Sequence, residues 1–320
     1  MDKSPLISFI IPVYNVPTDM LCNCLDSILR LSLKRDEREI IVIDDGSKFS
    51  PLDALRDYLD DIIFLRQKNG GLGCARNRGI LNTTGRYLQF IDADDALISN
   101  QYEHCIDLVR FNEPDMVMFD FSRNESSQKI YTDQKLVTGR YLLRHQNIKA
   151  TACGYLFKAT ILANLRFTPG IYHEDEEFTP LLILRAGTVL QTDAEAYFYR
   201  VRSNSITKNP DLRSTVKRLN DFKQIIYRLY QFSAGIPGSD SMALLRRVHQ
   251  MTMDYIYKVI VETRNRDYLD RQLEELRKKG LFPLPDKDYT AKYSWFRRLS
   301  NTAIDLSFLM RALPLMKRER

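Results

Sequence analysis

Tryptophan, histidine and cysteine are scarce in this 320-residue chain, and their scarcity excludes several kinds of site. The five cysteines are scattered along the chain, at Cys22, Cys24, Cys74, Cys105 and Cys153. An odd number at such positions argues against a disulfide framework and indicates a reducing compartment. The Cys22–Cys24 pair has no second pair with which to form a zinc site, and the four histidines are far apart.

Long apolar runs are also missing. The apolar stretch from Leu6 to Val13 is too short for the hydrophobic region of a signal peptide followed by a cleavage site. Nothing approaches the roughly 18 continuous apolar residues of a membrane-spanning helix. We therefore expect a cytoplasmic protein, for which peripheral contact with the inner face of the cell membrane stays an open alternative.

Acidic residues are scarce only near the C-terminal end. The chain has 47 basic and 41 acidic residues, a net charge of +6. Between Lys292 and Arg320, seven basic residues face two acidic ones, so this tail alone carries +5. Such an asymmetry predicts an anionic surface as partner. Nucleic acid is not expected, because the sequence contains no recognisable nucleic-acid-binding module.

Strand-like and helix-like patterns alternate over the first 120 residues. Short apolar runs predict strands at Ile7–Val13, Glu39–Asp44, Ile62–Leu65 and Tyr87–Ile91. The segments between them predict helices at Met20–Leu31, Pro51–Leu59 and Cys74–Leu81. This alternation predicts an α/β fold with a mainly parallel sheet, covered by helices on both faces.

The strand signal ends near residue 210. Before that point, Asp115–Phe121 and Glu195–Val201 predict further strands, with helices around 140–146, 158–164 and 175–185 between them. After it, helical patterns cover 212–232, 241–262 and 268–279, with Gly- and Pro-rich breaks between them. We predict an α/β domain over residues 1–210 and a helical C-terminal region over 211–320.

Polar residues of a particular kind follow each early strand. The first strand ends at Pro12-Val13-Tyr14-Asn15 and the second at Asp44-Asp45-Gly46-Ser47. The third leads into a glycine loop with arginines, Asn69–Gly79, and the fourth ends at Asp92-Ala93-Asp94-Asp95. The carboxyl ends of parallel strands meet at one sheet edge, where open α/β sheets bind their ligands.

The three aspartates of residues 92–95 carry the strongest chemical signal. Carboxylates so close together repel one another unless a cation neutralises them, and hard oxygen ligands select Mg²⁺ or Mn²⁺. The alternative is that they are ordinary turn and helix-capping residues. The glycine loop lacks the position and spacing of a dinucleotide fingerprint, and no GxxxxGK[ST] motif exists.

In this order, the motifs resemble those of the family 2 glycosyltransferases, which have the GT-A fold. The resemblance covers about residues 6–210. The matching segments are Phe9–Asn15, Ile40–Ser47, Asn69–Gly79, Thr84–Asp95, Glu174–Phe178 and Phe198–Thr207.

The resemblance implies roles at the sheet edge. Tyr14 would stack on the nucleobase of a nucleotide-sugar, Asp45 would accept a hydrogen bond from the base, and Arg76 would lie near the phosphates. Asp92 would contact the ribose, and Asp94, with Asp95, would hold Mn²⁺ or Mg²⁺ on the diphosphate. The remaining members of the implied nucleotide-sugar site are Pro12, Asn15, Gly70 and Ala93.

The acidic segment Glu174–Glu177 resembles the catalytic pair of the family, Glu174 and Asp175. Asp175 would be the general base of an inverting transfer, and the neighbouring carboxylates would raise its pKa. The alternative is an acidic first turn of a helix, which the helix dipole favours. The role of the adjacent His173 stays open.

The basic tail contains an apolar helical stripe. Its members recur at spacings of three and four: Phe296, Leu299, Ala303, Leu306, Met310 and Leu313. Basic amphipathic helices of this kind bind anionic membranes, and the equal alternative is a stripe packed on the protein's own helices or on a second copy. We expect the sequence after Pro314 to follow a break.

The sequence therefore predicts a metal-dependent, inverting glycosyltransferase. It would move one sugar from a nucleotide-sugar, a UDP-hexose or UDP-N-acetylhexosamine, to a hydroxyl of a glycan or lipid-linked glycan in surface polysaccharide synthesis. Processive members carry Gln-x-x-Arg-Trp, whereas the only tryptophan, Trp295, lies in another context. The alternatives are a non-catalytic sugar-nucleotide-binding scaffold on the same fold and a nucleotidyltransferase.

Overall fold

Eight strands form one sheet in the computed structural model, which describes residues 4–131, 134–201 and 211–316, without the side chains of 303–305 and 315–316. The strand order is β3-β2-β1-β4-β9-β6-β10-β8. Only β9 and β8 run against the other strands, so the predicted mainly parallel α/β sheet is confirmed. The strands are β1 (Ile7–Val13), β2 (Arg38–Asp44), β3 (Ile63–Arg66), β4 (Tyr87–Phe90), β6 (Met116–Met118), β8 (Gln134–Val137), β9 (Tyr155–Lys158) and β10 (Val189–Thr192).

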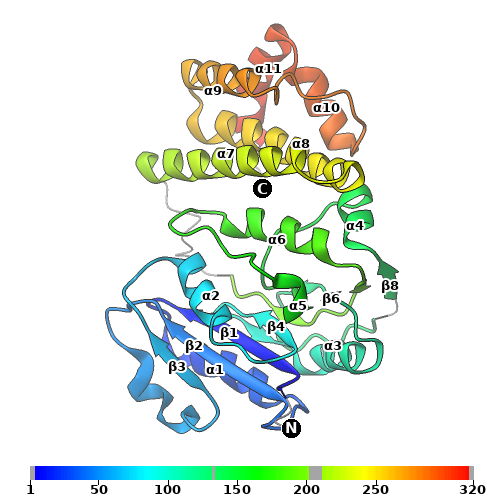
Figure 1. Ribbon diagram of the computed structural model, residues 1–320. Coiled ribbons are helices and arrows are strands. Elements are labelled where there is room, and N and C mark those ends of the chain that lie inside the picture. Colours follow the sequence, from blue (N-terminus) through cyan, green and yellow to red (C-terminus); the bar gives the residue numbers. More distant parts are fainter. Residues whose placement is uncertain (1–3, 132–133, 202–210, 317–320) are drawn as a thin grey trace. The chain divides into compact units, whose positions relative to one another are not determined.

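Helices cover both faces of this sheet (Figure 1). Successive residues of a strand point to opposite faces. In β1, the Phe9 ring lies 6.1 Å from Tyr102 of α3 (Ser99–Asn112), whereas Ile10 packs against Gly79 of α2 (Leu72–Ile80). A Cβ at Gly79 would lie 2.3 Å from the Ile10 side chain, so only glycine allows α2 this close to the sheet.

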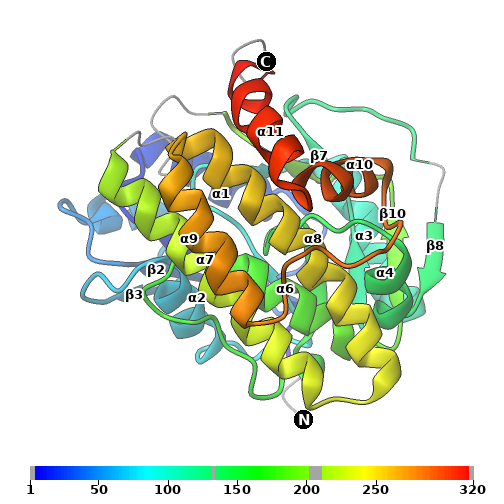
Figure 2. The same ribbon diagram turned by 90° about the horizontal axis from the view of Figure 1, so that it is seen from above.

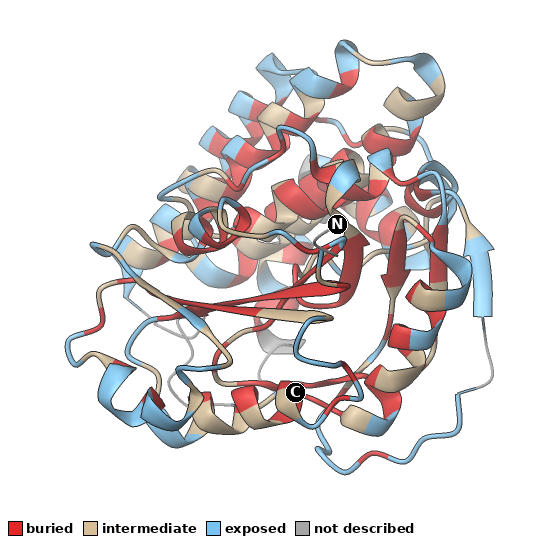
Figure 3. Ribbon diagram, turned by 60° about the horizontal axis from the view of Figure 1, so that its bottom comes forward, coloured by how far each residue is buried: buried red, intermediate tan, exposed pale blue. Residues whose placement is uncertain are grey.

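The α2 face also holds α6 (Glu174–Arg185), whose Phe178 packs edge-on against Phe90 of β4 at 6.1 Å. Figure 3 shows the central strands as buried and the edge strand β8 as exposed. A second, three-stranded sheet joins β5 (Ala96–Leu97), β11 (Tyr197–Phe198) and β7 (Phe121–Ser122). The remaining helices of this part are α1 (Thr18–Leu29), the 3₁₀ helix η1 (Pro51–Tyr58), α4 (Gly139–His145) and α5 (Ala159–Leu162).

Contacts divide the chain into two units. One comprises residues 1–142 and 148–203, and the other comprises 143–147 and 204–320. The second unit is helical, and Figure 2 shows α7, α8 and α9 lying along one another. Its helices are α7 (Leu212–Ala234), α8 (Gly238–Thr263), α9 (Arg266–Lys278), α10 (Ala291–Ser300) and α11 (Ala303–Met316).

Buried polar contacts join the helices of the second unit. The Lys223 amine of α7 donates to Gln272 Oε1 of α9 at 2.7 Å, and the Tyr255 hydroxyl of α8 donates to the same oxygen at 2.6 Å. Arg246 of α8 is buried and donates to the backbone oxygens of Leu143 and Gln146. These two bonds explain why residues 143–147 belong to the second unit, although the residues before and after them in the sequence belong to the first.

The predicted tail helix is wrong in two respects. It is divided into α10 and α11, because the Asn301 side chain exchanges two 3.0 Å hydrogen bonds with the backbone of Leu284 and so ends α10. Pro314 does not break the chain but lies inside α11, near its end, where the missing N–H costs a single helical hydrogen bond.

Half of the apolar stripe of the tail is buried on the protein itself, whereas Leu299 and Met310 are partly exposed. Phe296, Leu306 and Leu313 are each at most 5% exposed, and α11 packs against α8. Of the alternatives for this stripe, the structure supports packing on the chain's own helices. None of the helices described here is long and apolar enough to cross a membrane.

Candidate active site

The predicted site residues of the first two strands lie together at the carboxyl edge of the sheet. Val13 of β1 is the register partner of Asp44 of β2, and the Asp45 N–H donates to Val13 O at 2.8 Å. Asn15 has a left-handed backbone, with φ of 51°, and its N–H donates to Ser47 Oγ at 2.9 Å. These bonds fasten the two strand-end loops to each other.

Asp45 is the centre of the glycine loop. Its Oδ1 accepts hydrogen bonds from Gln67 Nε2 at 2.8 Å and from the Gly70 N–H at 2.9 Å, and its Oδ2 accepts from the Gly71 N–H at 2.8 Å. Only 3% of Asp45 is exposed. The sequence predicted a contact with a nucleobase here, and the structure adds a role in shaping the loop that starts α2.

Tyr14 is the most exposed aromatic residue of this part of the site. It is 50% exposed directly after β1, so a ligand can reach its side chain. Pro12 and Ala93 are buried, which limits their contribution to the shape of the backbone. The assignment of these residues to a nucleotide-sugar site stays a prediction.

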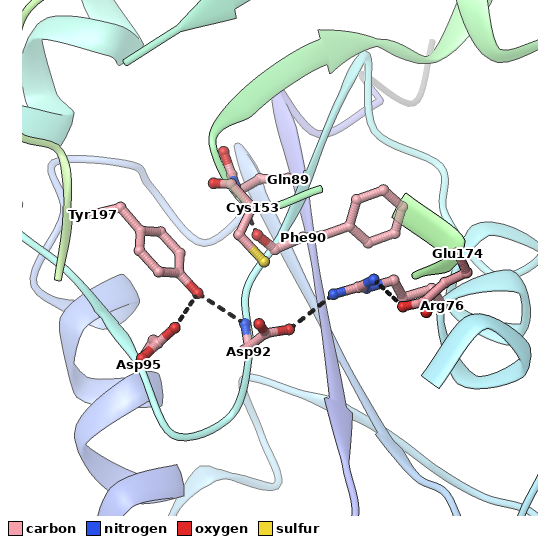
Figure 4. A network of polar contacts seen from close by, with 8 residues as sticks. All are labelled: Arg76, Gln89, Phe90, Asp92, Asp95, Cys153, Glu174 and Tyr197. Atoms are coloured by element: carbon pink, nitrogen blue, oxygen red, sulfur yellow. Dashed lines mark hydrogen bonds and ion pairs between the residues drawn. The ribbon is translucent and has the colours of Figure 1, made fainter. Parts of the chain in front are cut away.

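Arg76 joins the two acidic motifs, which lie about 80 positions apart in the sequence. Its Nη2 donates to Asp92 Oδ1 at 3.0 Å, and its Nη1 donates to Glu174 Oε1 at 2.9 Å (Figure 4). Its guanidinium also lies over the rings of Phe90 and Phe167, at 5.9 and 5.3 Å. Arg76 therefore holds the end of β4 against the start of α6.

This position gives Arg76 a structural role, whereas its predicted place beside the phosphates stays a prediction. Only 3% of the residue is exposed, and two carboxylates occupy the two ends of its guanidinium. Burial by itself lowers the pKa of an arginine, but the surrounding carboxylates outweigh it, so the pKa of Arg76 is raised. The charge is permanent, and Arg76 acts as a positioning residue.

One face of α2 carries the residues that bring α6 into place. Gly73, Arg76 and Asn77 share this face, at spacings of three and four. Asn77 exchanges hydrogen bonds of 2.8 and 2.9 Å with the backbone of Phe167, and a Cβ at Gly73 would lie 3.5 Å from Glu174 Cγ. The positioning role of Asn77 was missed, although its motif was recognised.

Asp175 and Glu174, the predicted catalytic pair, open helix α6. Glu174 is 7% exposed and paired with Arg76, so the structure gives it a positioning role. Asp175 is half-buried, and its pKa is raised to about 7 by burial, then by the charge of Glu174, with Arg76 acting in the opposite direction. A carboxylate with a pKa near neutrality is suited to general-base chemistry.

The turn of residues 92–95 separates its carboxylates by environment. Asp92 is paired with Arg76, and about a third of its side chain is exposed. Asp95 is 2% exposed, and its two oxygens accept from the Tyr197 hydroxyl at 2.9 Å and the Arg200 N–H at 2.8 Å. Burial and the charge of Asp92 raise the pKa of Asp95 to about 8.

This geometry argues against the predicted metal-binding role of Asp95, because its oxygens already have donors from the protein. The chemistry of the turn still fits a divalent cation, since Asp92 and Asp94 offer carboxylate oxygens and neither is fully buried. Within residues 4–131, 134–201 and 211–316, no three His, Cys, Asp or Glu side chains form a ready cluster. A cation here would therefore need further ligands, as from a diphosphate.

Comparison with known proteins identifies the first unit. The model of the family described as Glycosyl transferase family 2 matches residues 8–165. The chain is 30% identical over 223 residues to the uncharacterized glycosyltransferase EpsJ of Bacillus subtilis, over 64% of each chain. It is 27% identical over 211 residues to the poly(ribitol-phosphate) beta-glucosyltransferase of Bacillus spizizenii, over 61% of this chain and 32% of that one. The match thus spans less than two thirds of either relative.

Solved structures with the same fold cover nearly the whole chain. S. aureus TarS 1-349 in complex with UDP-GlcNAc superposes with a TM-score of 0.60 at 15% identity, over 98% of this chain and 92% of that one. The mannosyltransferase PcManGT from Pyrobaculum calidifontis, in complex with GDP-Man and Mn²⁺, gives 0.58 at 14% identity, over 99% and 87%. The predicted GT-A fold is confirmed.

Proposed function

We propose that this chain, whose residues 8–165 match the model of glycosyl transferase family 2, transfers one sugar from a nucleotide-sugar to a hydroxyl of a glycan or lipid-linked glycan. The observation that carries this proposal is the position of Asp175, which is half-buried at the start of α6, next to the Glu174 that Arg76 binds. Its pKa is raised to about 7. A base whose pKa lies near the cellular pH is largely deprotonated at that pH and still has enough affinity for the proton that it removes.

The proposed reaction is a single displacement with inversion. Asp175 takes the proton of the acceptor hydroxyl while its oxygen forms a bond to C1 of the sugar. The bond between C1 and the diphosphate oxygen breaks, and the nucleoside diphosphate leaves with both electrons. A single displacement needs no protein nucleophile. This agrees with the described residues that we assign to the site, since none of them is a serine or cysteine paired with a base.

The donor would lie along the carboxyl edge of the sheet. Tyr14 would stack on the base, Asp45 and the loop of Gly70 and Gly71 would frame it, and Asp92 would meet the ribose. Asp94 would hold Mn²⁺ or Mg²⁺ on the diphosphate, where a divalent cation neutralises the charge of the leaving group. TarS and PcManGT bind a UDP-sugar and a GDP-sugar respectively, which supports a nucleotide-sugar donor and makes UDP and GDP the first nucleotides to test.

Surface polysaccharide is the proposed product. The relative from Bacillus spizizenii is named for glucosyl transfer to poly(ribitol-phosphate), a polymer rich in hydroxyls. We infer a polyhydroxylated glycan or polyol acceptor of the same chemical class.

The function is tested by replacing the base and keeping everything else. Asp175→Asn should abolish sugar transfer while nucleotide binding with Mn²⁺ persists. Glu177→Gln is the matched control, since it makes the same chemical change in the same helical turn and keeps an oxygen for the Thr168 hydroxyl, which donates to Glu177 at 2.7 Å. Transfer that survives in Asp175→Asn would refute the assignment of the base.

The same assay separates the alternatives. Nucleotide-sugar binding without transfer or donor hydrolysis in the wild type would indicate the scaffold. Release of pyrophosphate from a nucleoside triphosphate would indicate the nucleotidyltransferase.

We further propose peripheral contact with an anionic membrane, through the outer sides of α10 and α11 rather than through the buried stripe. Trp295 is 48% exposed with Arg298 exposed one turn later, and Phe308 is 58% exposed with Arg311 exposed one turn later. Aromatic rings beside arginines suit the interface of an anionic bilayer.

The membrane proposal has a built-in probe, because Trp295 is the only tryptophan. Vesicles with phosphatidylglycerol should shift its fluorescence to the blue and sediment the protein, and vesicles of phosphatidylcholine should do neither. Arg298→Gln with Arg311→Gln should weaken both effects. An unchanged spectrum with anionic vesicles would contradict this contact.

A further inference from the structure

Tyr197 of β11 holds the turn of residues 92–95, although it lies 105 positions after Asp92 and 102 positions after Asp95 in the sequence. Its ring is fully buried, and its hydroxyl makes two hydrogen bonds to that turn (Figure 4). The hydroxyl oxygen accepts from the Asp92 N–H at 3.1 Å, and the hydroxyl hydrogen is donated to Asp95 Oδ2 at 2.9 Å. One group thus fixes the first and last residues of the turn.

Arg200 holds the middle of the same turn. Its N–H donates to Asp95 Oδ1 at 2.8 Å, and its Nε donates to the backbone oxygen of Asp94 at 3.0 Å. The Asp95 N–H closes the turn by donating to Asp92 O at 3.0 Å. Every residue of the turn except Ala93 is thereby bonded to the segment that contains β11.

The neighbouring strands make this clamp rigid. The residues directly after the turn form β5, which pairs with β11 so that Tyr197 lies opposite Leu97 and Phe198 opposite Ala96. The Tyr197 ring also packs edge-on against Phe121 of β7 at 5.1 Å. A buried hydroxyl with two partners in such a setting specifies one conformation, because a shift of the turn would leave buried polar groups without partners.

We infer that Tyr197 is a positioning residue of the donor site: its hydroxyl sets the turn on which Asp92 and Asp94 meet the nucleotide and its cation. The inference rests on the proposed function. The inference also explains why Asp95 is buried. Its carboxylate accepts hydrogen bonds from Tyr197 and Arg200 and thereby holds the turn, and we do not assign it a contact with the donor.

The test is binding of UDP and GDP by calorimetry, each with Mn²⁺ and with EDTA. Tyr197→Phe removes one oxygen and keeps the ring. We expect it to weaken nucleotide binding with Mn²⁺ about tenfold and to raise the donor KM in parallel. Binding in EDTA should weaken less, because only the contact of Asp92 with the ribose is then affected. Tyr102→Phe is the matched control, because Tyr102 is equally buried and its hydroxyl donates at 3.3 Å to Gln89 of β4, which is not a residue of the turn.

Each outcome decides one question. Equal Mn²⁺-dependent binding by the wild type and Tyr197→Phe would overturn the inference and leave the proposed function standing. A wild type that binds neither nucleotide would overturn the proposed function and the inference with it. If Tyr197→Phe does not fold, Arg200→Ala takes its place. It removes the bond to Asp94 O and the contact of the guanidinium with the Phe198 ring, and it keeps the backbone bond to Asp95. Undiminished binding in that variant would overturn the clamp.

Discussion

The pH dependence of transfer should reveal the two neighbours of Asp175 through shifts of opposite sign. Glu174 raises the pKa of Asp175 and Arg76 lowers it. Glu174→Gln removes a negative charge and keeps an oxygen for the 2.9 Å bond from Arg76. Arg76→Met removes the positive charge, whereas Arg76→Lys keeps it and serves as the control.

The magnitudes follow from the wild-type pKa of about 7. A base must be deprotonated to act, so kcat/KM should be about half of its plateau at pH 7 and about a tenth at pH 6. A neighbouring charge shifts a carboxyl pKa by about 1–3 units. Taking the lower value, Glu174→Gln should move the acid limb down by about one unit, which raises the rate at pH 6 about fivefold relative to its plateau.

Arg76→Met should move the limb in the other direction. A rise of about one unit leaves about a tenth of the plateau rate at pH 7, again a fivefold change. The variant also leaves Glu174 and Asp92 without their partner, and removing one member of a buried ion pair costs about 3–5 kcal/mol. Circular dichroism must therefore show that the variant is folded before its kinetics are compared.

The assay is release of the nucleoside diphosphate, followed as kcat/KM from pH 5 to 9 at saturating Mn²⁺, because this ratio reports the pKa of the free enzyme. Arg76→Lys should keep its limb near that of the wild type. Limbs that stay in place in both charge-removing variants, or that move in the same direction, would refute the reasoning that links Asp175 to this network.

Three further predictions follow from the same residues. Asp175→Asn should raise the melting temperature more at pH 8 than at pH 4. Burial opposes the ionised carboxylate and raises its pKa to about 7, so the folded wild type loses stability as the pH rises from about 4 to 7, and the variant does not. An equal gain at both pH values in scanning calorimetry would contradict this. Asp94→Ala should remove the Mn²⁺-dependent part of nucleotide binding in calorimetry and leave binding in EDTA unchanged. If the variant keeps the full Mn²⁺ dependence of the wild type, residues other than Asp94 hold the metal. Tyr14→Ala should lower donor affinity by about 1–3 kcal/mol, the value of a base stacked on an aromatic ring, and Tyr14→Phe should not, as measured by donor KM.

The local elements were the most predictable part of the fold. The strand predicted at Ile7–Val13 is β1 over those same residues, since a fully buried central strand is almost entirely apolar. The helix α3 and the strand β9 were not predicted. β9 exists only because it is inserted antiparallel between β4 and β6, a long-range pairing that its four residues do not encode.

The site was predictable as a place and less so as a set of roles. The strand-end positions of Asp45 and Asp92 and the place of Asp175 in an acidic first helical turn follow from patterns in the sequence. The structure brings Asp92 and the start of α6 together. The burial of Arg76, the engagement of Asp95 and the part of Tyr197 did not follow. Each depends on a partner about 100 positions away, and no local pattern records such a partner.

The sequence by itself determined the α/β alternation, the carboxyl edge at which the polar motifs meet, and the family whose motifs they resemble. The tertiary structure alone decided which charged groups stay available for a ligand and which are used to hold the site. The physical reason is that the state of a carboxylate depends on its burial and on the charges and donors that surround it. Asp95 shows this: two donors about a hundred positions away, the Tyr197 hydroxyl and the Arg200 N–H, bind its two buried oxygens and use its carboxylate to hold the turn.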